Sequence, residues 1–349
     1  MTDLSRIDVI APNFKRRHSG VTSTVIRLVP LQAKQIGITS CAPDLPPDVP
    51  NMAWTRLPGM ARAGPSGARV WHARRNVEMV AGLALKYGLQ KRLKLLFTSA
   101  AQRRHKPFTR WLIRQQDAII ATSSKSAAYL DRDATVIRHG VDCEQFRPAE
   151  DKAALRKALD LPSGTLIGCF GRIRHQKGND LFVAAMLRVL PGFPDAHALI
   201  MGRTTDNNQA FLDDLKARVA EAGLQAQVHF RDEVAIEQLA DHFRALDLYV
   251  APQRWEGFGL TPLEAMACCV PVIATRVGAF EELVRDGETG NLVDIEDVDA
   301  MAAHTQALLA DPKRIAQWGS AARDHVLANF QLRQEADAIV AIYRNLLAE

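Results

Sequence analysis

The stretch TLIGCFGRIRHQKG, residues 165–178, contains a short apolar run, a glycine where that run ends, a polar loop and a second glycine. A segment with helical spacing of apolar residues follows it, from about residue 179 to 190. A short apolar run, a glycine turn and a helix together indicate a βα unit of a parallel sheet. The stretch therefore predicts an α/β fold whose ligand-binding loops leave the carboxyl ends of the strands.

This alternation of strand-like and helix-like segments occurs twice along the chain. The predicted strands are residues 7–12, 94–100, 118–123 and 134–140 in the first half and 165–171, 197–202, 227–232, 247–252 and 271–276 in the second. The predicted helices are 22–37, 108–116, 179–190, 208–222, 236–245, 262–268, 297–310 and 332–347. We predict two Rossmann-like, doubly wound domains, residues 1–148 and 149–331, facing each other across a cleft. We expect the segment 332–349 to cross back to the first domain.

Composition indicates a soluble globular protein, with 47% apolar and 24% charged residues. The five cysteines form no CxxC pair or metal-ligand spacing, which fits a reducing cytoplasm. The opening MTDLSRIDVIAP lacks the basic start and apolar core of a signal peptide. No apolar run approaches the roughly 20 residues that span a bilayer. We therefore expect a cytoplasmic protein.

Positive charge is concentrated in the first part of the chain. Residues 1–150 hold 24 Lys and Arg against 11 Asp and Glu, an excess of 13 positive charges, whereas the whole chain carries +5. This asymmetry indicates an acidic partner, such as an anionic lipid, a phosphorylated or carboxylated glycan or a nucleic acid, with a solvated basic face as the simpler alternative. The clusters include Arg74-Arg75 and Arg103-Arg104-His105-Lys106. Nucleic acid is disfavoured because aromatic residues, which stack on bases, are only 6% of the chain.

The stretch WEGFGLTPLEAM, residues 255–266, places two glutamates around a Gly-rich turn. Thr261 and Pro262 suit an N-cap and a first helical position, so we predict a helix from Pro262 with Glu264 in its first turn. A capping box between Thr261 and Glu264 is the simpler alternative role for Glu264. Glu256 has no such role, and on the loop it is placed to bind ligand hydroxyls.

Two further loops suggest anion binding. Arg172 and Lys177, five residues apart after Gly171, could grip a diphosphate from two sides, with a basic surface turn as the alternative. In the first half, Gly20 follows His18 and precedes a helix that we predict to open near Thr22. Free N–H groups at that helix start could bind an anion, and Gly20 would let the ligand come close; a glycine that serves packing is the alternative.

Taken together, these segments resemble the C-terminal domain of family 4 glycosyltransferases of GT-B fold. The resemblance rests on the Gly171-Arg172 and Lys177-Gly178 pairs, on the Glu256-x7-Glu264 spacing and on PVIATRVGAFEELVRDGETG, residues 271–290. His139-Gly-Val-Asp142-x3-Phe146-x-Pro148 is similar to the family's interdomain segment. The first half, with WHARRN at 71–76, most resembles lipopolysaccharide core mannosyltransferases.

The resemblance implies a retaining transfer of a sugar from a nucleotide donor, without a metal or other cofactor; no DxD stands where a metal would be needed. Arg172, Lys177 and Glu256 would be catalytic, the two cations stabilising the leaving diphosphate. The donor would also contact Gly20, Gly171, Gly257, Phe258, Gly259, Leu260, Thr261 and Glu264, the last through ribose hydroxyls. The acceptor would contact His18, Arg74, Arg75, Arg103, Arg104 and His105.

One departure concerns the histidine that many relatives carry after the strand at 94–98. Here the strand continues with Ser99-Ala-Ala-Gln102-Arg103, so Gln102, Arg103 or His105 could substitute, although His105 could also be a surface residue. The resemblance implies GDP-mannose as donor and a lipid-linked, acidic inner-core acceptor at the cytoplasmic face of the bacterial inner membrane. A UDP-sugar on another bacterial glycan is the main alternative, and a basic nucleic-acid-binding protein a remote one. A GT-B epimerase or phosphorylase is disfavoured by the Glu-x7-Glu context and by the lack of a pyridoxal-type lysine site.

Overall fold

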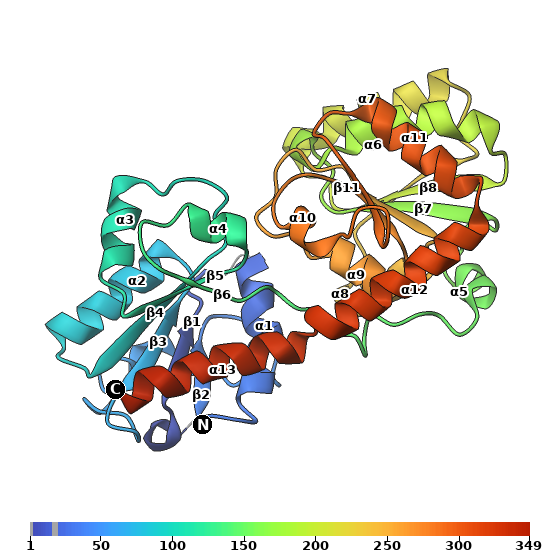
Figure 1. The fold of residues 1–349 in the computed structure, drawn as a ribbon. Coiled ribbons are helices and arrows are strands. Elements are labelled where there is room, and N and C mark those ends of the chain that lie inside the picture. Colours follow the sequence, from blue (N-terminus) through green and yellow to red (C-terminus); the bar gives the residue numbers. More distant parts are fainter. Residues whose placement is uncertain (1–2, 16–19) are drawn as a thin grey trace. The chain divides into compact units, whose positions relative to one another are not determined.

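The computed structural model describes residues 3–15 and 20–349 and divides the chain into two compact units (Figure 1). Unit 1 comprises Met1–Gly140 together with Leu332–Glu349, and unit 2 comprises Val141–Gln331. Each unit is a six-stranded parallel sheet with helices packed on it. The α/β class predicted from the alternating segments is therefore confirmed.

Unit 1 has the strand order β2-β1-β3-β4-β5-β6. Its strands are β1 Val9–Pro12, β2 Ile38–Cys41, β3 Arg69–Ala73, β4 Leu93–Ser99, β5 Ala118–Ala121 and β6 Thr135–Val136. Its helices are α1 Gly20–Gln32, α2 Asn76–Leu83, α3 Pro107–Arg114, α4 Ser124–Ala128 and α13 Leu332–Ala348, with short turns η1 Leu4–Arg6, η2 Trp54–Arg56 and η3 Ala84–Gly88.

Unit 2 has the strand order β12-β11-β10-β7-β8-β9, the doubly wound order of a Rossmann fold. Its strands are β7 Thr165–Phe170, β8 Ala196–Met201, β9 Val228–Arg231, β10 Leu248–Ala251, β11 Val272–Thr275 and β12 Gly290–Val293. Its helices are α5 Lys152–Ala158, α6 Asn179–Val189, α7 Gln209–Glu221, α8 Ile236–Arg244, α9 Thr261–Ala267, α10 Phe280–Leu283, α11 Val298–Leu309 and α12 Pro312–Asn329, with short turns η4 His175–Lys177, η5 Leu190–Gly192 and η6 Asp206–Asn208.

Both sheets are buried on both faces, as parallel sheets generally are. Alternate residues of a strand point to opposite faces. In β10, Tyr249 and Ala251 enter one apolar cluster, while Leu248 and Val250 enter the other. This is why the central strands are continuous apolar runs that can be predicted from the sequence.

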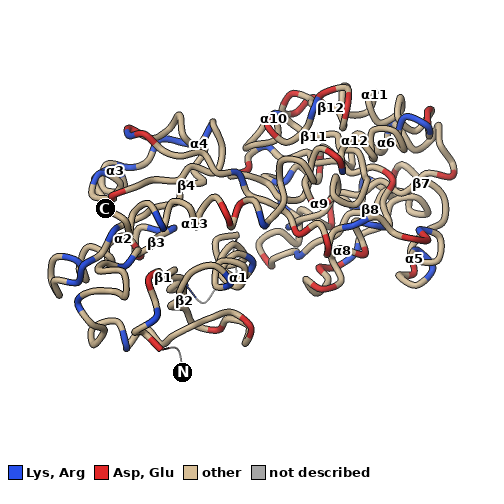
Figure 2. The backbone as a smooth tube through the Cα atoms, turned by 60° about the horizontal axis from the view of Figure 1, so that its bottom comes forward, with Lys and Arg blue, Asp and Glu red and all other residues tan. Residues whose placement is uncertain are grey.

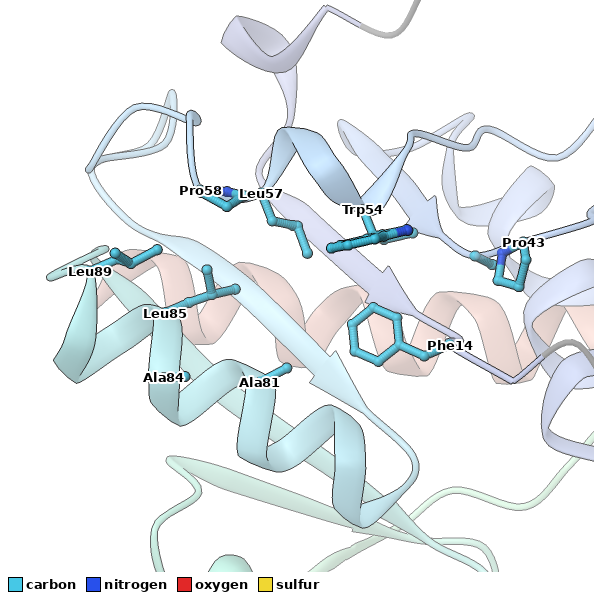
Figure 3. Close-up of a pocket in the computed structure, with 11 residues that line it drawn as sticks. Phe14, Pro43, Trp54, Leu57, Pro58, Ala81, Ala84, Leu85 and Leu89 are labelled. Atoms are coloured by element: carbon cyan, nitrogen blue, oxygen red, sulfur yellow. The ribbon is translucent and has the colours of Figure 1, made fainter.

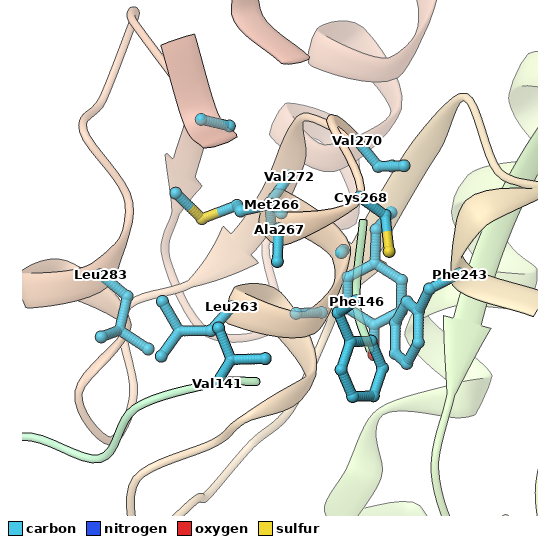
Figure 4. Packing of buried hydrophobic residues seen from close by; sticks show 14 of the residues in the cluster. Val141, Phe146, Phe243, Leu263, Met266, Ala267, Cys268, Val270, Val272 and Leu283 are labelled. Carbon is cyan, nitrogen blue, oxygen red and sulfur yellow. The ribbon is translucent and has the colours of Figure 1, made fainter. Parts of the chain in front are cut away.

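The division between the units follows Gly140, where the sequence led us to expect a boundary after residue 148. The reason is that Val141, Cys143 and Phe146 are buried in the core of unit 2 (Figure 4). The Phe146 ring meets the Phe243 ring edge-on, with centroids 5.9 Å apart. The interdomain motif is therefore part of the unit 2 core from its third residue on.

Helix α13 packs in unit 1 although it follows unit 2 in the chain. It contacts α1 and β3, and Tyr343 and Val340 are fully buried in the unit 1 core. The Tyr343 hydroxyl lies 2.6 Å from Nδ1 of His72 in β3, and Nε2 of that ring lies 2.7 Å from the Thr98 hydroxyl. Burial, and secondarily the charge of Arg74, holds the pKa of His72 well below its ordinary value. A neutral histidine thus joins the last helix to the centre of the sheet.

Candidate functional site

The loop after β7 lies at the point where the strand order of unit 2 reverses. β7 pairs with β10 on one side and β8 on the other, and the loops leaving β7 and β10 run in opposite directions along the sheet. Ligands of doubly wound sheets bind at this switch point. Gly171, Arg172 and Lys177 come from the β7 loop, and Glu256 comes from the β10 loop. The topology therefore brings two predicted motifs, about 80 residues apart, to one sheet edge.

Lys177 and Glu256 form an ion pair between Nζ and Oε2 across this edge. The other carboxylate oxygen of Glu256 accepts a hydrogen bond of 2.9 Å from the Gly257 amide. Only 21% of the Lys177 side chain and 19% of the Glu256 side chain are exposed. The motifs predict that these two residues act on one ligand, and in the structure they are in direct contact.

Arg172 lies on the same loop with its side chain exposed. Among the residues that the structure describes, it has no hydrogen-bond or ion-pair partner. A cation without a partner beside the Lys177–Glu256 pair keeps its full capacity to bind an anion. The alternative of a basic surface turn would explain Arg172, which is exposed. It does not explain Lys177, which is mostly buried in an ion pair with Glu256.

Arg254 also lies at this edge of the sheet, and no motif in the sequence pointed to it. Its guanidinium makes two hydrogen bonds to the Asp180 carboxylate, of 2.7 and 2.8 Å, and a third of 2.7 Å to the His175 carbonyl. Its backbone N–H donates to the Gln176 carbonyl at 3.1 Å. Arg254 therefore ties η4, which ends at Lys177, to the segment that carries Glu256.

Electrostatics agree with this bridging role. The hydrogen bonds to Asp180 raise the pKa of Arg254 above its ordinary value. Burial raises the pKa of Asp180, but the hydrogen bond and charge of Arg254 outweigh it and leave that pKa lowered. Only 14% of the Arg254 side chain and 18% of the Asp180 side chain are exposed, so water screens the pair weakly.

Two glycines fix the backbone of these loops. Gly178 has a φ of 72°, and a Cβ there would lie 1.9 Å from the Pro252 carbonyl oxygen. Gly259 has a φ of 89°, and a Cβ there would lie 2.2 Å from the Phe280 ring. Any side chain at either position would push the β7 and β10 loops apart or displace Phe280.

The predicted helix start at Pro262 with Thr261 as N-cap is off by one residue, and the alternative of a capping box is not found. Helix α9 begins at Thr261, its N-cap is Leu260, and no side chain caps it. Because Thr261 is already helical, its hydroxyl is not in the N-cap position, and Pro262 is the second helical residue rather than the first. Phe258 is buried, whereas Gly257, Leu260, Thr261 and Glu264 are half-buried. Helix capping therefore does not explain why a glutamate stands at position 264.

Unit 1 has its own switch point, between β1 and β3, where Arg74 and Arg75 leave β3. Arg75 is mostly buried, donates to the Asn13 side chain and pairs with Glu78 at 3.1 Å. Arg74 is 8% exposed, and its Nη1 donates to the His72 carbonyl at 3.3 Å. The basic cluster that the sequence shows at Arg74-Arg75 is therefore largely buried, because both residues directly follow the central, buried strand β3. Acceptor contact by either residue stays a prediction.

The remaining predicted acceptor residues follow β4. Arg103 and Arg104 are exposed. His105 is half-buried, with Nε2 3.2 Å from the Ser99 hydroxyl, and burial lowers its pKa. His105 is therefore not the surface residue that we considered as an alternative. Gly20 is exposed at the start of α1, and His18 lies outside the described residues.

The described part of the chain contains neither a membrane-spanning helix nor a metal-binding cluster. Within residues 3–15 and 20–349, no helix is both long and apolar enough to cross a bilayer. Within the same ranges, no three His, Cys, Asp or Glu side chains are grouped in a way that could hold a metal ion.

Comparison with known proteins places this site in a family. The sequence profile described as "Glycosyl transferases group 1" matches residues 151–325, which contain both site loops. The chain belongs to this family. It is therefore a glycosyltransferase, and its fold class is GT-B, as the sequence predicted.

Two relatives are similar to this glycosyltransferase along its whole length. The lipopolysaccharide core biosynthesis mannosyltransferase LpsB of Rhizobium meliloti (strain 1021) is 49% identical over 99% of this chain and 100% of its own. LpcC of Rhizobium leguminosarum bv. viciae, described in the same words, is 48% identical over 100% of this chain and 99% of its own. A solved glycosyltransferase from Rickettsia africae ESF-5 shares the fold, with a TM-score of 0.84 over 98% of this chain and 99% of that chain at 19% identity.

Proposed function

We propose that this glycosyltransferase moves mannose from GDP-mannose onto a lipopolysaccharide inner-core acceptor with retention of anomeric configuration. The observation that carries the proposal is the 49% identity, over nearly the full length of both chains, with a mannosyltransferase of lipopolysaccharide core biosynthesis. The loops of unit 2 supply the chemistry that such a transfer requires.

In the proposed mechanism, Arg172 and Lys177 bind the donor diphosphate and stabilise the charge that develops as the glycosidic bond breaks. Fixed cations stabilise such a leaving group most when they need no rearrangement. Lys177 is already held at this edge by Glu256 and by the Arg254-bound loop, which limits the rearrangement that it needs. We propose that these side chains act without a metal ion.

Glu256 binds the donor sugar in this scheme, together with the amides of Gly257, Phe258 and Gly259. Glu264, one turn into α9, binds the ribose hydroxyls. A carboxylate accepts hydrogen bonds from hydroxyl groups through two oxygens, which suits a polyhydroxylated ligand. In the structure Glu256 engages Lys177 and the Gly257 amide, so it is not an unpaired buried charge.

Thermal shift with three donors tests the proposal. GDP-mannose at a hundredfold excess over its Kd should stabilise the protein by about 2.7 kcal/mol, and UDP-glucose and UDP-N-acetylglucosamine at the same concentration by clearly less. Transfer from GDP-mannose should persist in excess EDTA. A larger shift with a UDP-sugar would support the alternative donor, and loss of transfer with EDTA would contradict the metal-free mechanism.

We further propose that unit 1 binds an acidic, lipid-linked acceptor at the cytoplasmic face of the inner membrane. Blue segments of the backbone tube, which mark Lys and Arg, are spread over this unit (Figure 2), in line with the excess of 13 positive charges in residues 1–150. On α3, the exposed rings of Phe108 and Trp111 stack at 6.1 Å. Aromatic rings beside cations suit a membrane interface.

Vesicle binding tests this location. Replacing Arg103 and Arg104 by alanine should weaken binding to anionic vesicles, since each cation near such a surface contributes about 1 kcal/mol. The matched control replaces Lys313 and Arg314, an adjacent basic pair on α12 of unit 2, and should leave binding unchanged. Equal losses in both double variants would show that net charge, rather than this segment, drives binding.

A further inference from the structure

Unit 1 contains an apolar pocket that the proposed reaction does not use. It has a volume of about 560 Å³ and lies between η2 and the α2–η3 helix (Figure 3). Trp54 and Leu57 line one side and Ala84, Leu85 and Leu89 the other, with Phe14 at one end. Apart from the Cys41 thiol, all lining side chains are hydrocarbon or proline rings or an indole.

The lining carries no charge at neutral pH. Burial raises the pKa of the Cys41 thiol to about 12, so it stays protonated. Trp54 nevertheless remains 67% exposed and Leu89 46% exposed. Exposed apolar side chains that are gathered around a cavity, instead of scattered singly, mark a binding site for an apolar group.

The size of the pocket suits a hydrocarbon chain. A water molecule takes up about 30 Å³ of liquid and a methylene group is of similar size, so the pocket has room for on the order of 15 chain carbons. A sugar or a nucleotide would leave its hydroxyl or phosphate groups without hydrogen-bond partners against these side chains. The pocket therefore excludes the polar groups of both substrates of the proposed transfer, namely the sugars and the nucleotide.

Charge around the mouth indicates what the chain is attached to. Exposed Lys15 follows Phe14, and Arg56 precedes Leu57. Exposed Arg62 donates to the Gln90 carbonyl at 3.2 Å, next to Leu89. In the stretches 14–15, 41–44, 54–62 and 89–90 that border the pocket, Asp44 contributes the one carboxylate. The segments that line the pocket therefore carry more positive than negative charge, which would attract an anionic headgroup.

We propose that this pocket binds an acyl chain of an anionic membrane lipid, with the headgroup held by the cations around the mouth. This inference goes beyond the proposed function, because neither the donor nor the transferred sugar enters it. Its consequence is that unit 1 recognises a membrane lipid through the chain as well as through charge.

The test uses the full-length protein and dansylundecanoic acid, whose emission rises in an apolar site. We expect saturable binding, displaced by myristoyl lysophosphatidylglycerol but not by glycerol phosphate, which has the headgroup charge and no chain. Displacement by glycerol phosphate, or no saturable binding, would overturn the proposal.

Two substitutions locate the binding. Ala84→Trp fills the pocket from an exposed position and should weaken probe affinity at least tenfold. Trp54→Ala removes one wall of the pocket and should weaken probe affinity about fivefold, because the probe then loses the burial of at least about one methylene group. Ala128→Trp, the same change at an exposed alanine of α4, is the matched control and should bind as wild type. If Ala84→Trp binds the probe normally, the site is elsewhere.

Vesicles and sedimentation identify the occupant. Phosphatidylglycerol vesicles should compete for the probe more strongly than phosphatidylcholine vesicles, and equal competition would contradict an anionic lipid. A dimer that Ala84→Trp dissociates would show that a second copy of the chain covers the pocket. Because no assay here contains a sugar nucleotide, failure of the GDP-mannose proposal and failure of this one are distinguishable.

Discussion

Replacing Arg254 by alanine should impair both stability and turnover. The substitution leaves the Asp180 carboxylate without its two hydrogen bonds of 2.7 and 2.8 Å, in a site where 18% of that side chain is exposed. Removing one partner of a buried ion pair costs about 3 to 5 kcal/mol, and the residual exposure places this pair at about 3 kcal/mol. The contact with Glu296 adds little, because 61% of that glutamate is exposed.

Turnover should fall because Arg254 holds the turn that ends at Lys177. Releasing the His175 carbonyl lets η4 move relative to Glu256. A misplacement of about 1 Å in a catalytic group can cost on the order of a hundredfold in rate, so we expect kcat to fall by about that factor. Arg254→Lys should be intermediate, since an ammonium keeps the charge but cannot reproduce the two-pronged contact.

Urea unfolding and transfer from labelled GDP-mannose measure the two effects. The control is Arg188→Ala, which breaks an ion pair with Asp299 in the same unit; those side chains are 52% and 88% exposed, so the loss should stay below about 1 kcal/mol with normal turnover. If Arg254→Ala is no less stable than Arg188→Ala, or if it keeps its kcat within twofold, the bridging role is refuted.

Three further changes probe other features. Lys177→Gln should lower kcat/KM for GDP-mannose by about 10² to 10³ in a steady-state assay, as expected when one preorganised group that stabilises charge is lost; an unchanged value would remove Lys177 from the mechanism. Gly259→Ala should destabilise the protein by about 1 to 3 kcal/mol in urea unfolding, because its Cβ would overlap the Phe280 ring; wild-type stability would show that the ring moves freely. His72→Gln should reduce the loss of stability on acidification. Because the pKa of His72 is lowered in the folded state, below about pH 6.5 the unfolded state binds a proton that the folded state does not. In wild type the free energy of unfolding therefore falls by up to about 1.4 kcal/mol per pH unit in that range. Urea unfolding at pH 7.5 and about 5.5 should therefore show a drop roughly 1 kcal/mol larger in wild type than in the variant, and equal drops would contradict a neutral buried imidazole.

The central strands of unit 2 could be predicted because their residues are apolar on both faces. Strands β2 and β3 could not, because Thr39, Ser40, Arg69 and His72 interrupt the apolar pattern although all four are buried. Those polar groups are satisfied by tertiary partners: Arg69, for example, donates to the Ile7, Ala61, Ala63 and Leu4 carbonyls. Such partners are not visible in local sequence.

The candidate site was predictable in part for a similar reason. Lys177 and Glu256 stand in motifs with recognisable spacing, so they could be assigned to one site. Arg254 sits in no motif, and its partner Asp180 is 74 residues away in the chain. The burial of Arg74 could not be predicted, because it depends on residues 69–73 forming a central strand.

Helix α13 also sets the order in which the nascent chain can fold. Unit 2 is one uninterrupted segment, so its core can close as soon as Gln331 has left the ribosome. Unit 1 must wait, because Leu332, Ile339 and Tyr343 complete its core. During synthesis, the amino-terminal part of this protein is thus the last to mature, and it stays exposed to chaperones and proteases while the later-made half is already folded.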